Sequence, residues 1–512
     1  MSQGRAFCLF KRLEKFSVED VFREAEKEFT QMVEKYKSPS SLWLNTIESE
    51  IAQDGRELTR KILQGHVDSR GTGNVGEAIT TTNNVLLTHR RLLKRNLQTL
   101  FGKICITRTG YSLRDHSHLF PLDALLNLPV LSSFSYGLQR FIARRVSTTA
   151  FSEALNLTLE ITGVTVGKRQ AIQIIEECAV DFDAYYAHKM ARKSRKASIL
   201  VLTTDGKGIV MRHEALREET QKRAVDAKQK MKTRLSRGEK SNRKRMAQVA
   251  SIYLIEQFVR IPKDIIDELR RQKADLRRPR PYQKRVWASV EKDSDDVIKD
   301  MFAEAHKRDS KHNKEWVVLV DGNKHQLHVV KSLAKKEGVN ATIILDIIHV
   351  IEYLWDAARV FINEANHAGC EAWVEEKLTQ ILYGKAGKVA GSIRMSAAKR
   401  KLEKDKNQTA KDCARYIARH KSYMNYVKYL KCGYPIATGV IEGACRYLIK
   451  DRMDITGARW GLTGAESVLK LRSLVTSGDF EDYWTFHLKS EHDRNYASKI
   501  KNLNKLQFIM SS

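Results

Sequence analysis

The sequence contains few residues that would break helices or cross-link loops. Among 512 residues there are seven prolines and seven cysteines. Proline interrupts helices, so its scarcity indicates a largely helical protein with few extended loops. The cysteines are scattered, with no Cys-x-x-Cys pair and no Cys/His cluster at zinc-ligand spacing. This argues against a disulfide framework or a zinc module, and it indicates reduced cysteines that mostly pack in the interior.

Long apolar runs and recognisable targeting features are also lacking. No stretch approaches the ~20 apolar residues that a transmembrane helix needs. The start Met1–Ala6 does not have the layout of a secretory signal. No Walker-type Gly-x-x-x-x-Gly-Lys-Ser/Thr is present for ATP. We therefore expect a soluble, intracellular protein that binds no membrane and uses no ATP.

Acidic residues are outnumbered by basic ones. The chain has 90 Lys and Arg against 61 Asp and Glu, which gives a net charge of +29 at pH 7. Such a surplus suits a polyanionic partner, and nucleic acid is the first expectation. A membrane surface is its main competitor, which the missing apolar span and secretory signal disfavour. The length exceeds that of one ordinary domain, so the chain can bury several cores.

Three apolar runs each lead into an aspartate. They are Ser198–Asp205, Trp316–Asp321 and Thr342–Asp346. Short runs of Val, Ile and Leu without alternation are typical of strands buried on both faces of a parallel or mixed sheet. Active sites of open α/β sheets collect at the carboxyl ends of strands, where neighbouring carboxylates can bind a hard divalent cation. The pattern predicts metal-dependent chemistry on nucleic acid.

Each aspartate also has a structural interpretation. Asp205 and Asp321 are each followed by glycine, and Asp-Gly is a favoured turn dipeptide. Asp346 precedes an apolar helical pattern, so it could simply cap that helix. The occurrence of all three in a strongly basic chain favours function over coincidence.

Shifts in pattern divide the chain into six segments. We expect a helical region (1–85), a basic β-element with a helix-turn-helix-like DNA-binding region (86–190), the first part of an α/β catalytic core with a return strand near Val210 (191–365), a basic helical insertion (366–435), the rest of the core with a helix bearing Glu442 (436–475), and a polar docking helix or tail (476–512).

The second segment contains a pattern that favours DNA binding. Phe151–Gly163 and the following residues read as helix, glycine-containing turn, helix. In a helix-turn-helix the second helix would direct Lys168, Arg169 and Gln173 toward the major groove. Ordinary packing of a helical hairpin explains the same pattern.

Two further basic segments could follow a phosphate backbone. The first runs from Lys228 to Lys244, and the second, between Arg277 and Arg285, is interleaved with Tyr282 and extends to Trp287. The first is equally explained as a solvated surface segment, and the aromatic residues of the second could belong to a core.

The order of elements resembles a known catalytic core. A strand ending in Asp205, two more strands, strands ending in Asp321 and Asp346, and a distant helix bearing Glu442 resemble the RNase H-like core of DDE transposases. The chain as a whole is similar to bacterial ISKra-type insertion-sequence transposases. The resemblance covers most of the chain and rests on Leu202–Gly208, Leu319–Gly322, Leu345–Trp355, Ala437–Arg446 and Lys450–Trp460, with Thr99–Gly102 and Asp181–Tyr185 also fitting.

This resemblance implies a set of site residues. Asp205, Asp321 and Glu442 would bind two Mg²⁺ ions, for which Mn²⁺ could substitute, while Asp346 and His349 match an auxiliary Asp-x-x-His element. Reasoning from the residues alone leaves open whether Asp321 or Asp346 is the second metal ligand. The implied fold is an RNase H-like mixed sheet with a helical insertion, preceded by a mostly α-helical DNA-binding region with a small β-element.

The implied activity is DNA strand transfer. The enzyme would nick the ends of a transposable element and join the exposed 3′-hydroxyl to target DNA. It would act as a homo-oligomer on duplex DNA, in the bacterial cytoplasm at the nucleoid. Arg446 and Lys450, one and two helical turns past Glu442, could contact phosphates or pair with a nearby acid. A nuclease that does not join strands, and a non-catalytic DNA-binding regulator, remain the alternatives.

Overall fold

The chain forms two compact units, Met1–Ala187 with Gly478–Ser512, and His188–Ser477. The computed structural model describes residues 18–37, 41–116, 118–192, 198–226, 242–270, 278–400, 402–455 and 457–501. The C-terminal helix therefore belongs with the N-terminal part of the chain.

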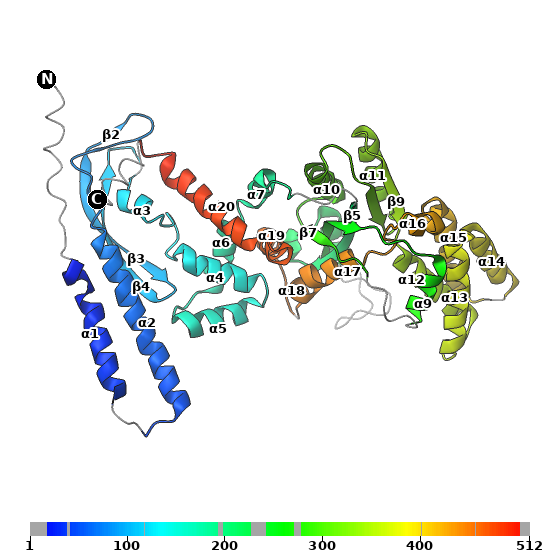
Figure 1. Ribbon diagram of the computed structural model, residues 1–512, viewed down its shortest axis with the longest axis horizontal. Coiled ribbons are helices and arrows are strands. Elements are labelled where there is room, and N and C mark those ends of the chain that lie inside the picture. Colours follow the sequence, from blue (N-terminus) through cyan, green and yellow to red (C-terminus); the bar gives the residue numbers. More distant parts are fainter. Residues whose placement is uncertain are drawn as a thin grey trace. The chain divides into compact units, whose positions relative to one another are not determined.

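The first unit combines helices with one long β-hairpin (Figure 1). Its helices are α1 (Val18–Lys37), α2 (Leu44–Ser69), α3 (Pro121–Leu125), α4 (Tyr136–Val146), α5 (Phe151–Thr162), α6 (Lys168–Cys178), α7 (Phe182–His188) and α20 (Phe480–His492), which continues into a π-helical turn, Asp493–Ala497. Its strands are β1 (Ile79–Thr80), β2 (Leu86–Leu87), β3 (His89–Thr99) and β4 (Gly102–Ser112).

The hairpin β3–β4 confirms the expected basic β-element and extends it. Thr99 pairs with Gly102 at the tip, and Gly102 has a φ of 116°, a conformation that glycine adopts without strain. Buried Leu97, Ile104 and Ile106 face one side of the ribbon and pack against Leu122 of α3. The alternation of these apolar residues with polar ones explains why the segment is a strand pair.

Helices α4, α5 and α6 pack together, and α5–α6 has the expected helix, turn, helix layout. Gly163 ends α5 with a φ of 69° in the left-handed region. Ala171, Ile174 and Cys178 give α6 a buried face at helical spacing. Tyr483 of α20 donates a hydrogen bond to the carbonyl of Cys178 (2.6 Å), which fixes the C-terminal helix on α6.

The second unit is built on a five-stranded mixed sheet. The strands are β5 (Ser198–Val210), β6 (Lys244–Glu256), β7 (Tyr282–Ser289), β8 (Trp316–Val320) and β9 (Ala341–Leu345), in the spatial order β7-β6-β5-β8-β9. β5, β6 and β7 are antiparallel neighbours, whereas β5, β8 and β9 run parallel. β8 is buried throughout, as expected for an unalternating apolar strand in the interior of a covered sheet.

Helices surround this sheet and fill the stretch between β9 and the helix bearing Glu442 (Figure 1). They are α8 (Glu218–Asp226), α9 (Pro262–Leu269), α10 (Ser294–Arg308), α11 (Lys324–Lys336), α12 (Ile347–Phe361), α13 (His367–Leu382), α14 (Ala386–Lys399), α15 (Lys404–His420), α16 (Tyr426–Lys431), α17 (Gly439–Ala444), α18 (Asp451–Met453) and α19 (Leu462–Ser477). Short 3₁₀ turns cover His213–Ala215 and Lys421–Tyr423, and a π-helix covers Cys445–Lys450.

One expected element of this unit is wrong. The return strand near Val210 does not exist, because β5 is a single strand that pairs with β6 from Ser198 to Val210. The sequence suggested a break because Gly206 and Gly208 interrupt the apolar run. Glycine lacks a side chain to pack but keeps its backbone donor and acceptor, so the long β6 still holds these residues in the ladder.

Candidate active site

Three aspartates stand in register across the parallel part of the sheet. In the pairing of β5 with β8 and of β8 with β9, the residues two positions before Asp205, Asp321 and Asp346 lie side by side. Residues two apart in a strand share a face, and neighbouring strands are ~4.8 Å apart. The register therefore brings all three aspartates to one edge of the sheet, with Asp321 in the middle.

Asp205 reaches this row from within a strand. It lies opposite Val249 of β6, so the interpretation of Asp205-Gly206 as a turn, and the expectation that the strand ends there, are both wrong. β8 ends at Val320, and β5 projects past it. The half-buried carboxylate accepts hydrogen bonds from the Gly206 amide (2.6 Å) and the Cys445 thiol (3.2 Å).

Asp321 stands at a turn after β8, and its turn chemistry is as expected. Gly322 has a φ of 90°, and a Cβ at this position would lie 3.1 Å from atoms of both His420 and Tyr416. The Asp321 carboxylate accepts a hydrogen bond from the amide of Asn323 (2.7 Å). The Tyr416 hydroxyl donates to the Asp321 carbonyl (2.7 Å), so helix α15 holds this loop in place.

Asp346 is the N-cap of α12, which confirms the structural interpretation of this residue. Its side chain is 1 % exposed. One carboxylate oxygen accepts from the amide of Ile348 (2.9 Å), and the other accepts from the hydroxyl of Thr438. Both oxygens therefore already have partners within the protein.

Glu442 completes the set from helix α17. Thr438, just before this helix, contacts Asp346, and Cys445, just after it, contacts Asp205. Buried Ile441 and Ala444 fix the inner face of α17. Because its two ends are attached to the outer members of the aspartate row, the helix places half-buried Glu442 beside that row.

The charges of Asp346, Glu442 and His349 shift one another's pKa values. Burial raises the pKa of Asp346 to about 7, and the charge of Glu442 adds to this rise while that of His349 opposes it. Burial also raises the pKa of Glu442, with contributions from the charges of Glu352 and Asp205. Burial alone would lower the pKa of His349, but Asp346 and Glu352 raise it. Asp205, Glu442, Asp346 and His349 thus form one electrostatic cluster.

The donor chemistry of this cluster suits a hard divalent cation. Carboxylate oxygens are the ligands that Mg²⁺ prefers, whereas His and Cys favour softer metals. The carboxylate oxygens of Asp205, Asp321 and Glu442 do not all lie within 4.8 Å of one another. Among the described residues, the one group of three acidic, His or Cys side chains whose ligand atoms all lie within 4.8 Å of one another is Asp181, His487 and Glu491.

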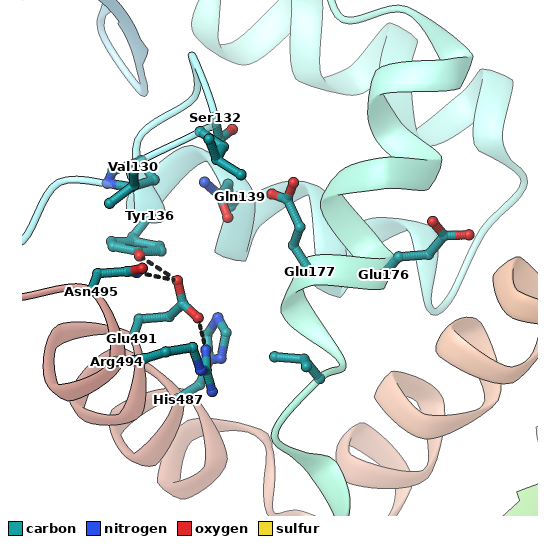
Figure 2. Close-up of a pocket in the computed structure, with 13 residues that line it drawn as sticks. Val130, Ser132, Tyr136, Gln139, Glu176, Glu177, His487, Glu491, Arg494 and Asn495 are labelled. Atoms are coloured by element: carbon teal, nitrogen blue, oxygen red, sulfur yellow. Dashed lines mark hydrogen bonds and ion pairs between the residues drawn. The ribbon is translucent and has the colours of Figure 1, made fainter. Parts of the chain in front are cut away.

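Two members of that compact group, His487 and Glu491, line a cavity of about 430 Å³ in the first unit. Figure 2 shows Glu491 in the wall of this cavity, between Tyr136 and Asn495 on one side and Arg494 on the other. Arg494 donates to both Asp181 and Glu491, and His487 lies 2.7 Å from Asp181. The guanidinium already neutralises the carboxylates, so this is an ion-pair network rather than a cation site.

Arg446 and Lys450 are exposed, but not at the spacing that the sequence suggested. An α-helix would place them one and two turns past Glu442, whereas Cys445–Lys450 is π-helical and has more residues per turn. Arg446 lies 3.8 Å from Asp451. The ion pair with a neighbouring acid, the alternative to a phosphate contact, is therefore present.

The predicted DNA-reading residues lie on the outer face of α6. Lys168, Arg169 and Gln173 are exposed, opposite the buried face of this helix. Gln173 donates to Glu177 one turn further along (3.0 Å), which leaves Lys168 and Arg169 as the cationic N-terminal end. A recognition helix contacts base edges with such an end.

The two other basic segments are only partly described. Residues 227–241 and 271–277, which include most of the first segment and Arg277 of the second, lie outside the described residues. Arg285 and Trp287 are buried, and Arg285 forms an ion pair with Glu304. Base stacking by Trp287 is therefore wrong, and this residue belongs to a core.

Three residues around the site have no signal in the sequence. Tyr416, Thr438 and Cys445 contact Asp321, Asp346 and Asp205 from positions 95, 92 and 240 residues away. No local pattern distinguishes a tyrosine or a cysteine that faces a carboxylate from one that faces the core. Only the tertiary fold brings them together.

Comparisons with known proteins add no family. The chain matches no protein-family model, and no curated protein matches it. Among the described residues, none of the helices is long and apolar enough to cross a membrane.

Proposed function

We propose that this chain is a metal-dependent DNA strand-transfer enzyme of the DDE transposase type, with an RNase H-like catalytic core. The observation that supports it best is the row of Asp205, Asp321 and Asp346 across parallel strands, with Glu442 attached beside it. Structural carboxylates are usually neutralised by Lys or Arg. Among the described residues no Lys or Arg forms an ion pair with these four carboxylates, and the histidines His349 and His420 lie near them.

The sheet supports the proposed fold class. In the second unit, three antiparallel strands, β5 to β7, come first. β8 and β9 follow them and extend the sheet in parallel from β5. A helical stretch then separates the aspartates from the acidic helix α17. This is the order of elements on which the resemblance to the RNase H-like core of DDE transposases rests.

The carboxylates divide into two roles. Asp205, Asp321 and Glu442 are only half-buried, and in our proposal they hold two Mg²⁺ ions, with Mn²⁺ as a substitute. When bound, such ions lower the pKa of the attacking water or hydroxyl and stabilise the oxygens of the phosphodiester under attack. Asp346, buried with both oxygens engaged, positions α12 and, through Thr438, the helix that carries Glu442. This distinction favours Asp321 over Asp346 as the second ligand.

In our proposal, His349 supplies positive charge beside the carboxylates when no metal is bound. Its imidazole is 3.0 Å from Glu352, and its raised pKa favours the charged form beside Asp346. In our proposal it positions Asp346 by charge and is not a metal ligand, since its positive charge offsets the repulsion between the neighbouring acids.

The rest of the molecule suits a DNA substrate. A net charge of +29 favours duplex binding through phosphates. The exposed end of α6 offers Lys168 and Arg169 for the recognition of element ends, with Gln173 in support. Assembly as a homo-oligomer on DNA, in the bacterial cytoplasm, is part of the same proposal.

The proposal is tested with supercoiled plasmid that carries the DNA flanking the coding sequence, together with a target plasmid. Parent protein in Mg²⁺ should nick the flanking DNA and join it to the target. Asp205→Asn, Asp321→Asn and Glu442→Gln should bind DNA like the parent and do neither. Glu364→Gln, on an exposed loop after α12, is the matched control and should keep both activities.

Other outcomes identify the alternatives. Cleavage without joining, lost in the same variants, would assign the site to a nuclease. Binding by the parent without cleavage in Mg²⁺ or Mn²⁺ would assign the chain to the non-catalytic regulators.

A further inference from the structure

A second cavity of about 430 Å³ lies in the unit that contains the aspartate row. This volume falls in the range of roughly 300–1,000 Å³ that small-ligand sites occupy. Its apolar wall includes Phe258, Pro281, Ile436 and Val440, and its rim carries Arg260, Arg278 and Arg280. The lining carries three arginines against one acid, Glu256, so a mostly apolar cavity with a cationic surplus is complementary to a molecule with an apolar body and negative charge.

One segment of chain separates this cavity from the carboxylates. Pro435 to Val440 contributes several lining residues, among them Ile436 and Ala437. The same segment contains Thr438, which donates to Asp346, and it leads directly into the helix of Glu442. The Ile436 carbonyl also accepts from the amide of Ile347 (3.0 Å), the first residue of α12. The cavity and the carboxylate row therefore share a wall.

Tyr253 of the sheet also lies close to both the cavity and Asp346. It lines the cavity from β6, and burial together with the charge of Asp346 raises its pKa. A ligand in the cavity thus lies within electrostatic range of the proposed reaction centre.

Of these arginines, Arg260 is held by neutral groups and Arg278 by an acid. Arg260 donates to the carbonyls of Phe258 (3.4 Å) and Tyr434 (3.0 Å), which accept hydrogen bonds but do not neutralise its charge. Arg278 forms an ion pair with Glu268. Burial first, and then repulsion by the charge of Arg278, lower the pKa of Arg260 to about 10. An anionic group between them would relieve this repulsion.

We propose that this cavity, the nucleotide pocket, receives one unpaired nucleotide of the DNA strand bound at the carboxylates. The base would insert beside Phe258, Ile436 and Pro281, and its phosphate would lie against Arg260 and Arg280. This assignment rests on the proposed function, and it adds that the enzyme holds locally unpaired DNA next to the bond that it cuts. Bases stack on apolar and aromatic side chains with little sequence preference, and extrusion is easiest where pairing is already lost.

The test is a metal-free binding measurement, which does not depend on catalysis. Fluorescein-labelled duplexes, either fully paired or with one unpaired thymidine, are compared by fluorescence anisotropy in EDTA. The parent should bind the unpaired form about tenfold more tightly, the effect of one stacked base. Ala437→Trp, at an exposed position of the wall, should remove this preference and leave affinity for the paired duplex unchanged.

A second variant guards against misfolding of the first. Arg280→Ala should reduce the preference for unpaired DNA several-fold, whereas Arg415→Ala, an exposed arginine of α15, should not change it. No preference in the parent, or full preference in Ala437→Trp and Arg280→Ala, would overturn the nucleotide pocket. Either of these results, combined with metal-dependent joining by the parent, would leave the proposed function standing.

Discussion

Two acidic clusters of this chain have opposite surroundings. In the first unit, Asp181 and Glu491 are bound by Arg494, and His487 also contacts Asp181. In the second unit, the carboxylates of Asp205 and Asp321 accept from backbone amides and a thiol, and Asp346 has His349 as its nearby cation. In the first cluster Arg494 attracts both carboxylates and the group is compact, whereas the carboxylates of the second repel one another. The difference separates a structural network from a site that can attract cations.

The largest effect should separate the clusters by activity. Asp205→Asn should lower the nicking rate in Mg²⁺ by roughly a hundredfold to a thousandfold, the loss seen when one group that stabilises a transition state is removed. Asp181→Asn should retain nicking within a few-fold, provided that rates are normalised to folded protein. The nicking rates are measured on end-labelled DNA. Equal losses of rate in the two variants would contradict the distinction between a catalytic and a structural cluster.

The second effect should separate them by stability. Asp181→Ala leaves His487, which is 1 % exposed, without its acceptor and Arg494 without one of its two carboxylates. The free energy of unfolding should fall by about 1–3 kcal/mol, the cost of an unsatisfied buried polar group. Asp205→Asn should instead leave stability unchanged or raise it, because it removes one of several repelling charges. Urea denaturation of both variants measures this contrast, and a comparable loss in Asp205→Asn would contradict it.

These contrasts also show what the sequence could predict. The aspartate row follows from three apolar strands, since parallel register places equivalent positions side by side. The continuation of β5 past Asp205 could not be predicted from the sequence, because Gly206 and Gly208 interrupt the apolar pattern of the strand. The hydrogen bonds that keep these residues in the strand come from β6, which is distant in the sequence. The π-helical turn after Glu442 and the contacts of Tyr416 and Thr438 depend on tertiary packing, and local sequence carries no record of them.

A smaller effect concerns pH. In the folded protein the pKa of Asp346 is about 7, above its ordinary 3.8, because of burial first and of the charge of Glu442. The folded state therefore binds more protons than the unfolded state between these values, and stability should fall as pH rises from about 4 to about 7. The raised pKa of His349 acts in the same direction. Thermal melts in EDTA should show a shallower fall for Asp346→Asn, and an unchanged slope would contradict this account of burial.

The smallest effect concerns recognition by α6. Arg169→Ala should reduce discrimination between flanking DNA and random duplex by about 1–3 kcal/mol if Arg169 reads a base. Gln173→Ala should have less effect, because Gln173 is already bonded to Glu177. Competition binding at fixed salt measures both, and unchanged discrimination in Arg169→Ala would move recognition of element ends to another surface.

The most direct measurement is a calorimetric titration with Mn²⁺, whose binding does not require DNA cleavage. The parent should bind two ions per chain at the carboxylate row, and Asp205→Asn, Asp321→Asn and Glu442→Gln should each weaken or abolish this binding. Asp181→Asn should bind like the parent, because Arg494 already occupies the cation position of that cluster. Binding that persists in the three row variants but disappears in Asp181→Asn would contradict the assignment of the metal site.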